Sequence, residues 1–461
     1  MEDNRENVDD VKLDPEKSPI ARADFLREKI KQRPINKKKL LRRTLITMTL
    51  AVVFGAVACL TFVFLAPVIN NRLYPEETPT PVALTEETVA DEMQPEDMYA
   101  DDNAIAAEAA SVAIDMASSE LSKMKSEMTS HQADQTDYMD MYASLKSVAT
   151  SAEKSLVTVT SKTSDTNWIN DPYESEGQTC GVIVADNGAE YLILVQTSAI
   201  SDAESIQVTF CDETVGSAYL KQSDAVTGLG IVAVKYKDIS ENTRAAIGVA
   251  PLGSSKTGGV IGTPVIAVGR PMGTRGSMCY GFVTSANSDL DLADSNYKLL
   301  TTDMNGSTNA SGAIINLSGS VVGFIDMKYN TQAMPNVLSA VGITELRALI
   351  EDLSNGKGRT FVGIHGQTVP KDIQEGENIP AGAYVIRTEM DSPAMLSGVQ
   401  SGDIITAVNG EEVAGFDTFV SRIRDVKPGT QVTLTLMRQA AEGYAELTID
   451  ISSDNSTDNA E

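Results

Sequence analysis

The stretch "GAYVIRTEMDSPAMLSGVQSGDIITAVNGEEV", Gly382–Val413, decides how the C-terminal part of the chain is interpreted. It contains residue types that start and end short elements, at Ser392-Pro393-Ala394, Gly398, Gly402-Asp403 and Asn409-Gly410. Ser-Pro is typical of a helix start, glycine of a helix end, and Asn-Gly of a tight hairpin turn. The segments "FDTFVSRIRDV" and "TQVTLTLMR" that follow predict a helix and a strand. These signals predict a small mixed module that begins near residue 360.

This module resembles the PDZ domains that accompany bacterial proteases, and the resemblance covers residues 359–453. In such domains an extended peptide joins the edge of a sheet, and backbone amides of a glycine-containing loop bind its terminal carboxylate. The matching peptide-binding positions are Phe361, Val362, Gly363 and Ile364. Gly363 suits this role because its missing Cβ permits close approach, although an ordinary glycine at the start of a strand is the simpler alternative. His365 adjoins the segment, and we expect it to be a surface residue.

The middle of the chain reads as a series of short strands. From Ser155 onwards, β-branched runs such as "SLVTVTS", "EYLILVQ", "GIVAVKY" and "PVIAVGR" alternate with turn residues. Strands at this spacing predict an all-β sandwich or barrel. Almost no helical pattern interrupts them until "GITELRALIEDL", where Leu346 to Leu353 predicts a closing helix.

Followed by a PDZ-like module, residues 144–352 resemble the trypsin-like domain of the HtrA (DegP, DegS) family, and "ITELRALIEDLSNGKGRTFVGI" resembles that family's junction. The resemblance implies a mainly β fold: a trypsin-like double β-barrel plus a PDZ domain. It also implies a nucleophile within "TTDMNGSTNASGAIINLSGSVVGF". Alignment from the front of the family motif places Ser311 on the nucleophile, whereas alignment from its back end places Ala310 there. The glycines and proline that flank the family nucleophile are replaced, which argues against an intact oxyanion hole.

The other members of a catalytic triad are missing from the expected positions. A serine hydroxyl becomes a good nucleophile only when a neighbouring base accepts its proton. The resemblance places Ser198 where that histidine belongs and Gly228 where the orienting aspartate belongs. The chain has only 2 histidines, His131 and His365, and both lie outside the barrels. A Ser–Lys dyad would need a buried lysine that no motif indicates, so we expect Ser311 to be a vestigial nucleophile.

The N-terminal segment predicts a membrane anchor. Residues 44–69, "TLITMTLAVVFGAVACLTFVFLAPVI", carry no charge and are long enough to cross about 30 Å of hydrocarbon as a helix. A cleaved signal peptide and a buried helix are the alternatives. Lys and Arg are concentrated before the span, and Asp and Glu after it. We therefore expect a single-pass protein of the cell membrane, with its N-terminus in the cytoplasm and its later domains outside.

The remaining segments complete the predicted organisation. Residues 1–43 form a basic cytoplasmic tail, 70–143 an acidic linker with a stalk helix at 105–128, and 454–461 a disordered tail. The stalk helix is either solvated or a short oligomerising coil. The formal net charge of −27, with basic clusters confined to the tail, argues against a nucleic-acid partner.

The cysteines indicate neither a redox nor a metal site. Cys59 lies in the predicted span, which leaves Cys180, Cys211 and Cys279 outside. A bridge between Cys180 and Cys211 is one interpretation, and scattered buried thiols are the simpler one. We expect no cofactor and no metal.

These features together predict a membrane-anchored, extracytoplasmic HtrA-like pseudoprotease. Its PDZ domain would bind peptides or unfolded protein C-termini, in protein quality control or as a scaffold. An active serine endopeptidase of the HtrA family and a structural adaptor for an active relative are the two alternatives. The resemblance also implies assembly, as a homo-trimer or together with such a relative.

Overall fold

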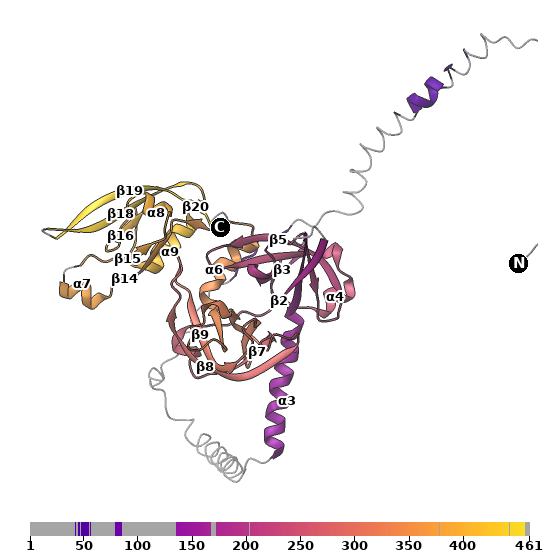
Figure 1. Cartoon of the computed structure of the whole chain (residues 1–461), viewed down its shortest axis with the longest axis horizontal. Helices are drawn as coiled ribbons and strands as arrows, with labels where there is room; N and C mark the ends of the chain where they lie inside the picture. The colour runs from indigo at the N-terminus through magenta and orange to yellow at the C-terminus, as the bar shows by residue number, and fades with distance from the viewer. Residues whose placement is uncertain are drawn as a thin grey trace, which may run out of the picture. The chain divides into compact units, whose positions relative to one another are not determined.

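The structure is a computed structural model of the 461-residue chain. It describes residues 42, 45–46, 48–54, 56, 79–84, 135–166, 172–201, 203–377, 379–441 and 443–456. The chain divides into two compact units, Met1–Glu76 and Glu77–Glu461. Figure 1 labels the helices and strands.

In the first unit, the described residues between 42 and 56 are helical, and their side chains are exposed. They overlap the predicted span at 44–69, of which residues 57–69 lie outside the described residues. Within the described part of the chain, no helix is both long and apolar enough to cross a membrane. The predicted stalk helix at 105–128 also lies outside the described residues.

The first closed barrel has the strand order β1-β2-β3-β6-β5-β4. Its strands are β1 Leu156–Thr166, β2 Pro172–Asp186, β3 Glu190–Gln196, β4 Ser205–Thr209, β5 Val215–Asp224 and β6 Leu229–Lys235, followed by the short helix α4 Glu241–Ala246. β3 is apolar almost throughout because both of its faces are buried. Ile193 packs inside the barrel, whereas Leu192 and Leu194 belong to a second cluster outside it.

The second closed barrel has the strand order β10-β11-β12-β9-β8-β7. Its elements are the short helix α5 Thr257–Val260 and the strands β7 Pro264–Arg270, β8 Ser277–Asp289, β9 Lys298–Asn305, β10 Ser311–Asn316, β11 Val321–Ile325 and β12 Val337–Gly342. Val265, Leu300 and Ile314 are among the residues that fill its interior. The two barrels confirm the prediction of a mainly β, trypsin-like double barrel.

The helix α6, Ile343–Ser354, packs on apolar residues from both barrels. Its buried side chains recur at three- and four-residue intervals, as a helix with one apolar face requires. They are Ile343, Leu346, Leu349, Ile350 and Leu353. The cluster that receives them includes Leu194 of the first barrel and Val268 of the second. α6 contains the predicted closing helix and begins three residues before it.

The predicted boundary between stalk and barrel domain, at residues 143 and 144, lies within a helix. A continuous helix, α3 Gln135–Ala152, crosses it and leads into β1 (Figure 1). Ala149 of α3 is fully buried, and Leu145 and Val148 pack against the same cluster as α6. The C-terminal end of this helix therefore packs as part of the barrel domain.

A short part of the predicted acidic linker is also attached to the barrels. The side-chain amide of Asn355 accepts from the Val82 N–H at 3.0 Å and donates to the Val82 carbonyl at 2.9 Å. The Thr80 N–H donates to the Asn187 carbonyl at 2.9 Å. Residues 79–84 thus lie along the barrel domain rather than forming a free tether, because their backbone polar groups find partners there.

The C-terminal module has a sheet in the order β14-β15-β16-β18-β19, with β17 paired to β16, and a separate β13-β20 pair. Its strands are β13 Thr360–Phe361, β14 Ile364–Thr368, β15 Ala383–Thr388, β16 Ile404–Val408, β17 Glu411–Glu412, β18 Gln431–Ala440, β19 Gly443–Ser452 and β20 Asp454–Asn455. Its helices are α7 Lys371–Glu377, α8 Pro393–Leu396 and α9 Phe416–Asp425. β14 lies at an edge of the sheet, where its outer backbone groups are available to another segment.

Two local predictions for this module are confirmed, and one is wrong. Asn409 and Gly410 have φ of 50° and 82°, as the hairpin turn between β16 and β17 requires. Ser392 caps α8 by accepting the Met395 N–H at 3.3 Å. The predicted disordered tail, in contrast, begins with the ordered strand β20, because Asp454 and Asn455 pair with β13.

A glycine contact between β7 and β10 generates a prediction about stability. Gly312 has φ of +121° and faces Gly269, and a Cβ on Gly312 would lie 2.2 Å from the Val268 carbonyl oxygen. We expect Gly312→Ala to lower the free energy of unfolding by about 3 kcal/mol, from backbone strain and overpacking together. Chemical denaturation measures this loss.

Gly188→Ala is the matched control for this variant. Gly188 has φ of +83°, and a Cβ there would meet nothing within 4 Å. This control should lose only the strain contribution, about 1–2 kcal/mol. Equal losses for the two variants would contradict the close packing at Gly312.

Candidate functional site

A cleft of about 770 Å³, here called the barrel cleft, is formed by loops that follow strands of both barrels. Its lining residues are Gly177, Gln178, Thr179, Gln196, Thr197, Ser198, Ala199, Gly228, Arg270, Gly273, Ser307, Thr308, Asn309, Ala310, Asp326, Met327 and Lys328. Most of these residues are polar. Ser198, Gly228 and Ala310, which are distant in sequence, meet in this cleft.

Ser311 does not line the barrel cleft. It is the first residue of β10, its side chain is buried, and its Oγ accepts the Cys180 N–H at 2.9 Å. Pairing with β7 sets this orientation, because Ser311 lies opposite Arg270 and Gly312 opposite Gly269. Ser311 therefore stays a prediction for the nucleophile position, and its alternative Ala310 borders the cleft although its side chain is buried in the core of the second barrel.

A lysine occupies the space beside Gly228. The Lys328 ammonium donates to the Thr227 carbonyl, and a Cβ placed on Gly228 would lie 2.7 Å from the Lys328 Nζ. Lys328 also lies 3.6 Å from the Asp326 carboxylate. Burial raises the pKa of Asp326, and the nearby Lys328 opposes this rise. The position aligned with the triad acid thus borders a cation instead of carrying a carboxylate.

Lys328 does not meet the requirement for a Ser–Lys dyad. Its side chain is 44% exposed, so water can solvate its ammonium, whereas a catalytic lysine base needs burial to lose its proton. Sequence reasoning missed Lys328 because no motif surrounds it. Its position depends on the 3₁₀ turn Met327–Tyr329 that follows β11.

His365 lies in β14 of the C-terminal module and not in the barrel cleft. Its side chain is only 2% exposed, so the prediction of a surface residue is wrong. Its Nδ1 lies 2.6 Å from the Asp291 carboxylate, and its Nε2 lies 2.9 Å from that of Glu389. Two acids distant in sequence bury this ring, which local sequence could not indicate.

The predicted peptide-binding loop does bind a carboxylate, and that carboxylate belongs to Asp294. The Val362 and Gly363 N–H groups donate to Asp294 Oδ2 at 2.8 Å each, and the Ile364 N–H donates to Oδ1 at 2.9 Å. Phe361, in contrast, is buried in β13 and pairs with Asp454. Three of the four predicted positions therefore donate to one carboxylate. Asp294 itself was not predicted, because no motif marks it.

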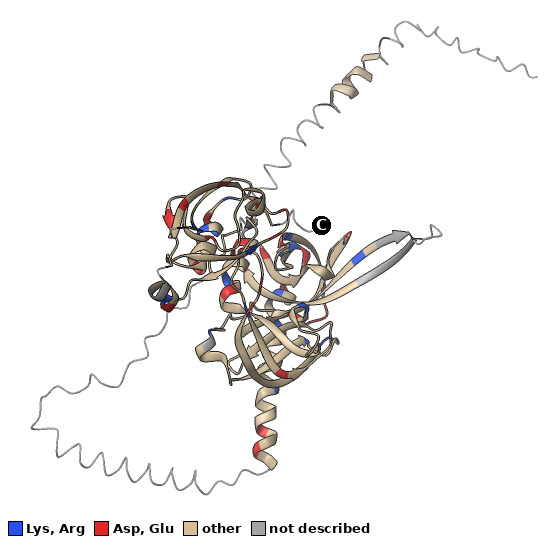
Figure 2. Cartoon of the chain, turned by 60° about the vertical axis from the view of Figure 1, so that its left-hand side comes forward, with Lys and Arg blue, Asp and Glu red and all other residues tan. Residues whose placement is uncertain are grey.

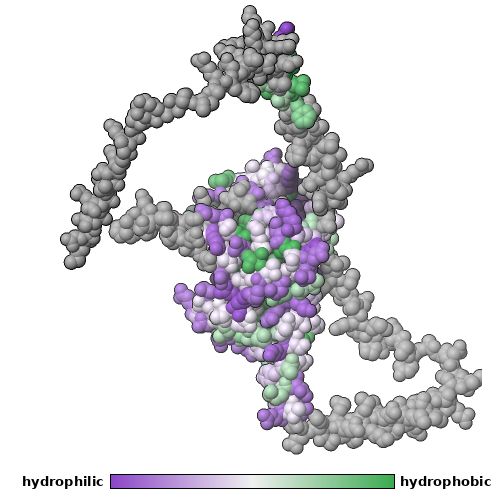
Figure 3. Space-filling view, turned by 90° about the vertical axis from the view of Figure 1, so that its right-hand side faces the viewer, coloured by the Kyte–Doolittle hydropathy of each residue, from purple (hydrophilic) through white to green (hydrophobic). Residues whose placement is uncertain are grey.

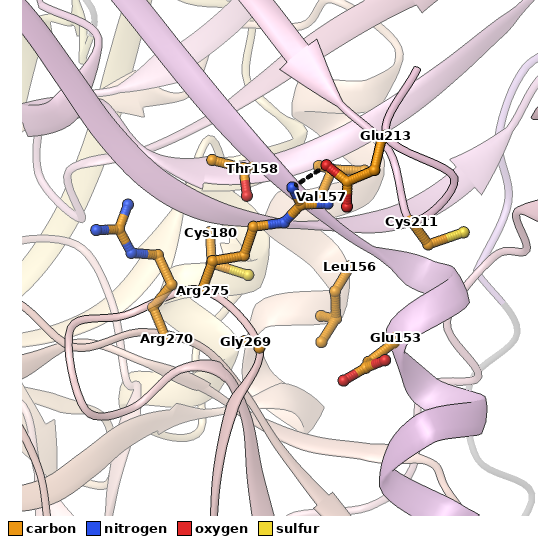
Figure 4. A pocket seen from close by; sticks show the side chains of 11 residues that line it. Glu153, Leu156, Val157, Thr158, Cys180, Cys211, Glu213, Gly269, Arg270 and Arg275 are labelled. Carbon is orange, nitrogen blue, oxygen red and sulfur yellow. Dashed lines mark hydrogen bonds and ion pairs between the residues drawn. The ribbon is translucent and has the colours of Figure 1, made fainter. Parts of the chain in front are cut away.

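A smaller pocket of about 320 Å³ lies beside Cys180 (Figure 4). Burial raises the pKa of the Cys180 thiol to about 12, so this group stays protonated and unreactive at neutral pH. Across the pocket, Arg275 pairs with Glu213 at 2.7 Å. Cys180, Cys211 and Cys279 are free, and the described residues include no metal-binding group of acidic, histidine and cysteine side chains.

Comparison with known proteins assigns a family to each part of this geometry. Residues 179–324 match the trypsin-like peptidase domain, and residues 358–451 match the PDZ domain. The chain is 26% identical over 278 residues to the serine protease Do-like HtrB of Bacillus subtilis (strain 168). It is 28% identical over 292 residues to the periplasmic pH-dependent serine endoprotease DegQ of Escherichia coli (strain K12). The chain thus has a trypsin-like peptidase domain followed by a PDZ domain, and over this region it is similar to proteases of the HtrA and Deg type.

The similarity to these two proteases covers only part of each chain. The alignments cover 56% and 61% of this chain and span 59% and 61% of the two relatives. A solved structure of the HtrA-type protease AlgW with a decapeptide matches 67% of this chain and 97% of its own, at 17% identity and a TM-score of 0.48.

The two serines near the cleft should differ in what they contribute to stability. Ser311→Ala removes the acceptor of the buried Cys180 N–H, so we expect a loss of about 1–3 kcal/mol in the free energy of unfolding. Ser198 is exposed, and Ser198→Ala should change stability by less than about 0.5 kcal/mol. Urea denaturation of both variants measures the difference. A fully stable Ser311→Ala protein would contradict the structural role assigned to this hydroxyl.

Proposed function

We propose that this chain is an HtrA-like pseudoprotease that binds peptides or protein C-termini through its PDZ domain. The observation that supports the proposal is the lining of the barrel cleft, which includes Ser198 and Gly228, the residues that the resemblance aligns with the triad histidine and aspartate. Anchoring to the cell membrane by residues 44–69 and an extracytoplasmic location are further parts of the proposal. They are supported by the uncharged run and by the basic residues before it.

The chemistry of acyl transfer supports the absence of cleavage. Attack on a peptide bond needs a nucleophile, a base that accepts its proton and a group that orients the base. Ala310 has no nucleophilic atom, and Ser311 is buried with its Oγ accepting the Cys180 N–H. Among the described residues the only histidine is His365, in the PDZ domain. The remaining residues of the cleft could accelerate peptide cleavage only by the small factor that substrate binding supplies.

The backbone amides of Val362, Gly363 and Ile364 support the binding of peptide C-termini. They converge on a single carboxylate group, which is the geometry that a terminal carboxylate needs. The neighbouring strand β14 is the edge strand of the sheet, the position at which an extended peptide can join. Lys and Arg are scattered among Asp and Glu over the described chain (Figure 2), and hydrophilic residues dominate the face shown in Figure 3. These surfaces fit a peptide ligand better than a nucleic acid.

Two alternatives rest on specific observations. The relatives are named as proteases, which favours an active serine endopeptidase. The helix α3 exposes Tyr138, Met139, Met141 and Tyr142, which favours assembly, as a homo-trimer or with an active relative for which this chain would be an adaptor. A test of proteolytic activity separates the first alternative from the proposal.

The wild-type chain should neither cleave unfolded casein nor react with a fluorophosphonate probe, because no base activates a serine in the cleft. Gel fluorescence and a casein-release assay measure this, with trypsin as a positive control. Probe labelling that Ser311→Ala abolishes would establish the active endopeptidase instead.

Peptides should bind through their terminal carboxylates. For a decapeptide with an apolar last residue, we expect the free acid to bind the full chain about tenfold or more tightly than the C-terminal amide, because hydrogen bonds to a charged group contribute about 1.5–3 kcal/mol. Fluorescence anisotropy compares the two forms. Equal affinities would mean that the PDZ domain recognises internal segments or another surface.

A further inference from the structure

The carboxylate loop of the PDZ domain is already filled by the chain itself. Asp294 lies in the connection between β8 and β9 of the second barrel, and its carboxylate accepts the N–H groups of Val362, Gly363 and Ile364 at 2.8, 2.8 and 2.9 Å. A peptide with a free C-terminus would need the same three donors. One amide cannot donate fully to two carboxylates, so the two ligands exclude each other.

The backbone of Asp294 also imitates a bound peptide. Its N–H donates to the Ile364 carbonyl at 2.8 Å, on the edge strand β14. An added strand makes this kind of bond when it joins a sheet edge. Asp294 therefore provides both contacts expected of the last residue of a peptide: a carboxylate in the amide loop and an N–H paired with the edge strand.

Flanking residues hold this segment against three elements of the PDZ domain. Asp291 contacts His365 of β14 at 2.6 Å and Arg387 of β15 at 2.8 Å. On the other side of Asp294, the Asn296 amide donates to Asp417 in the first turn of α9. The segment Asp291–Asn296 thus runs from the edge of the sheet to the helix, across the region where a peptide would lie.

Asp294 occupies this position in spite of two unfavourable features. Its φ of +51° is in the left-handed region, which non-glycine residues rarely adopt. Its side chain is 2% exposed, and burial raises its pKa, while Arg359 and the three backbone amides act in the opposite direction. The three amides and Arg359 offset only part of the burial penalty, so a ligand without these two unfavourable features could compete with Asp294 for the same donors.

We propose that Asp291–Asn296 is a built-in ligand of the PDZ domain, with Asp294 in place of a peptide's terminal carboxylate, and that peptides bind only after this segment leaves. The proposal rests on the peptide-binding function proposed above. The docked segment lowers the peptide affinity that a titration measures. This measured affinity is the affinity of the open PDZ domain multiplied by the fraction of molecules in which the segment has left. Displacement releases a stretch of the second barrel's surface each time a peptide binds.

The test measures peptide affinity in the full chain after removal of the Asp294 charge. The probe is a pool of fluorescein-labelled decapeptides with random internal residues, a free C-terminus and Val, Leu or Phe as the last residue. Asp294→Asn keeps the side-chain shape but presents an amide to the three donors. We expect this variant to bind the pool at least tenfold more tightly than the wild type by anisotropy, with the amidated pool remaining weak.

Asp289→Asn is the matched control. Asp289 ends β8, near the same connection, and its carboxylate pairs with Lys298 at 2.5 Å. Like Asp294→Asn, the Asp289→Asn substitution removes one negative charge from this region. It therefore corrects for a general change in the electrostatic attraction of anionic peptides. The control should bind the pool as the wild type does, and a gain equal to that of Asp294→Asn would overturn the proposal.

Hydrogen exchange of the wild-type chain gives a second measurement that needs no variant. Without peptide, the amides of Val362, Gly363 and Ile364 should exchange slowly because Asp294 accepts from them. Fast exchange of these amides would overturn the built-in ligand, even if Asp294→Asn fails to fold.

The outcomes separate this proposal from the function on which it rests. Free-acid binding of equal strength by the wild type and a folded Asp294→Asn protein would overturn the built-in ligand and leave peptide binding intact. Absence of free-acid binding in every folded variant would overturn the peptide-binding function, and with it the displacement proposed here.

Discussion

The buried guanidinium of Arg359 joins three parts of the second unit. It lies 3.4 Å from the Asp224 carboxylate at the end of β5, and it donates to the carbonyls of Ala293 and Asp294. The side chains of Arg359 and Asp224 are 10% and 0% exposed. A charge removed from water this far must be paired, and removing one partner is strongly destabilising. The pairing therefore fixes where the β8–β9 connection can lie, and this position brings Asp294 to the amides that begin the PDZ domain.

A second constraint, the register of β10 against β7, decides where the Ser311 hydroxyl lies. Gly312 lies opposite Gly269, and their close contact leaves no room for a shift of one residue. A one-residue slip in a strand reverses the direction of every side chain. The observed register buries Ser311 beneath the Cys180 N–H, whereas the neighbouring Ala310 packs in the core of the second barrel and borders the cleft. The burial of the Ser311 hydroxyl therefore depends on this single register.

Local sequence predicted the features that depend on local physics. The Asn409-Gly410 turn, the Ser392 cap and the apolar face of α6 each follow from residues within a few positions of one another, and all three are present. The sequence left Ser311 and Ala310 as alternatives because the choice depends on pairing with β7, about 40 residues earlier in the chain. It placed His365 at the surface because the acids that bury it come from other segments. The predicted barrel boundary falls within α3 because only a few positions of this helix are buried.

The electrostatics of the barrel cleft extend the argument about catalysis beyond the missing residues. In a working triad, the buried acid stabilises the positive charge that the histidine acquires when it accepts the serine proton. Here the Lys328 ammonium stands beside Gly228, so the charge next to that position has the opposite sign. A cation about 4 Å from an imidazolium opposes its formation by about 1–4 kcal/mol at the dielectric constants of water and protein surfaces. A histidine at position 198 would therefore lack support for its charged form even with a serine at position 310. The cleft differs from a triad in the arrangement of its charges as well as in its side chains, because a lysine paired with Asp326 lies beside the position that the triad acid would hold.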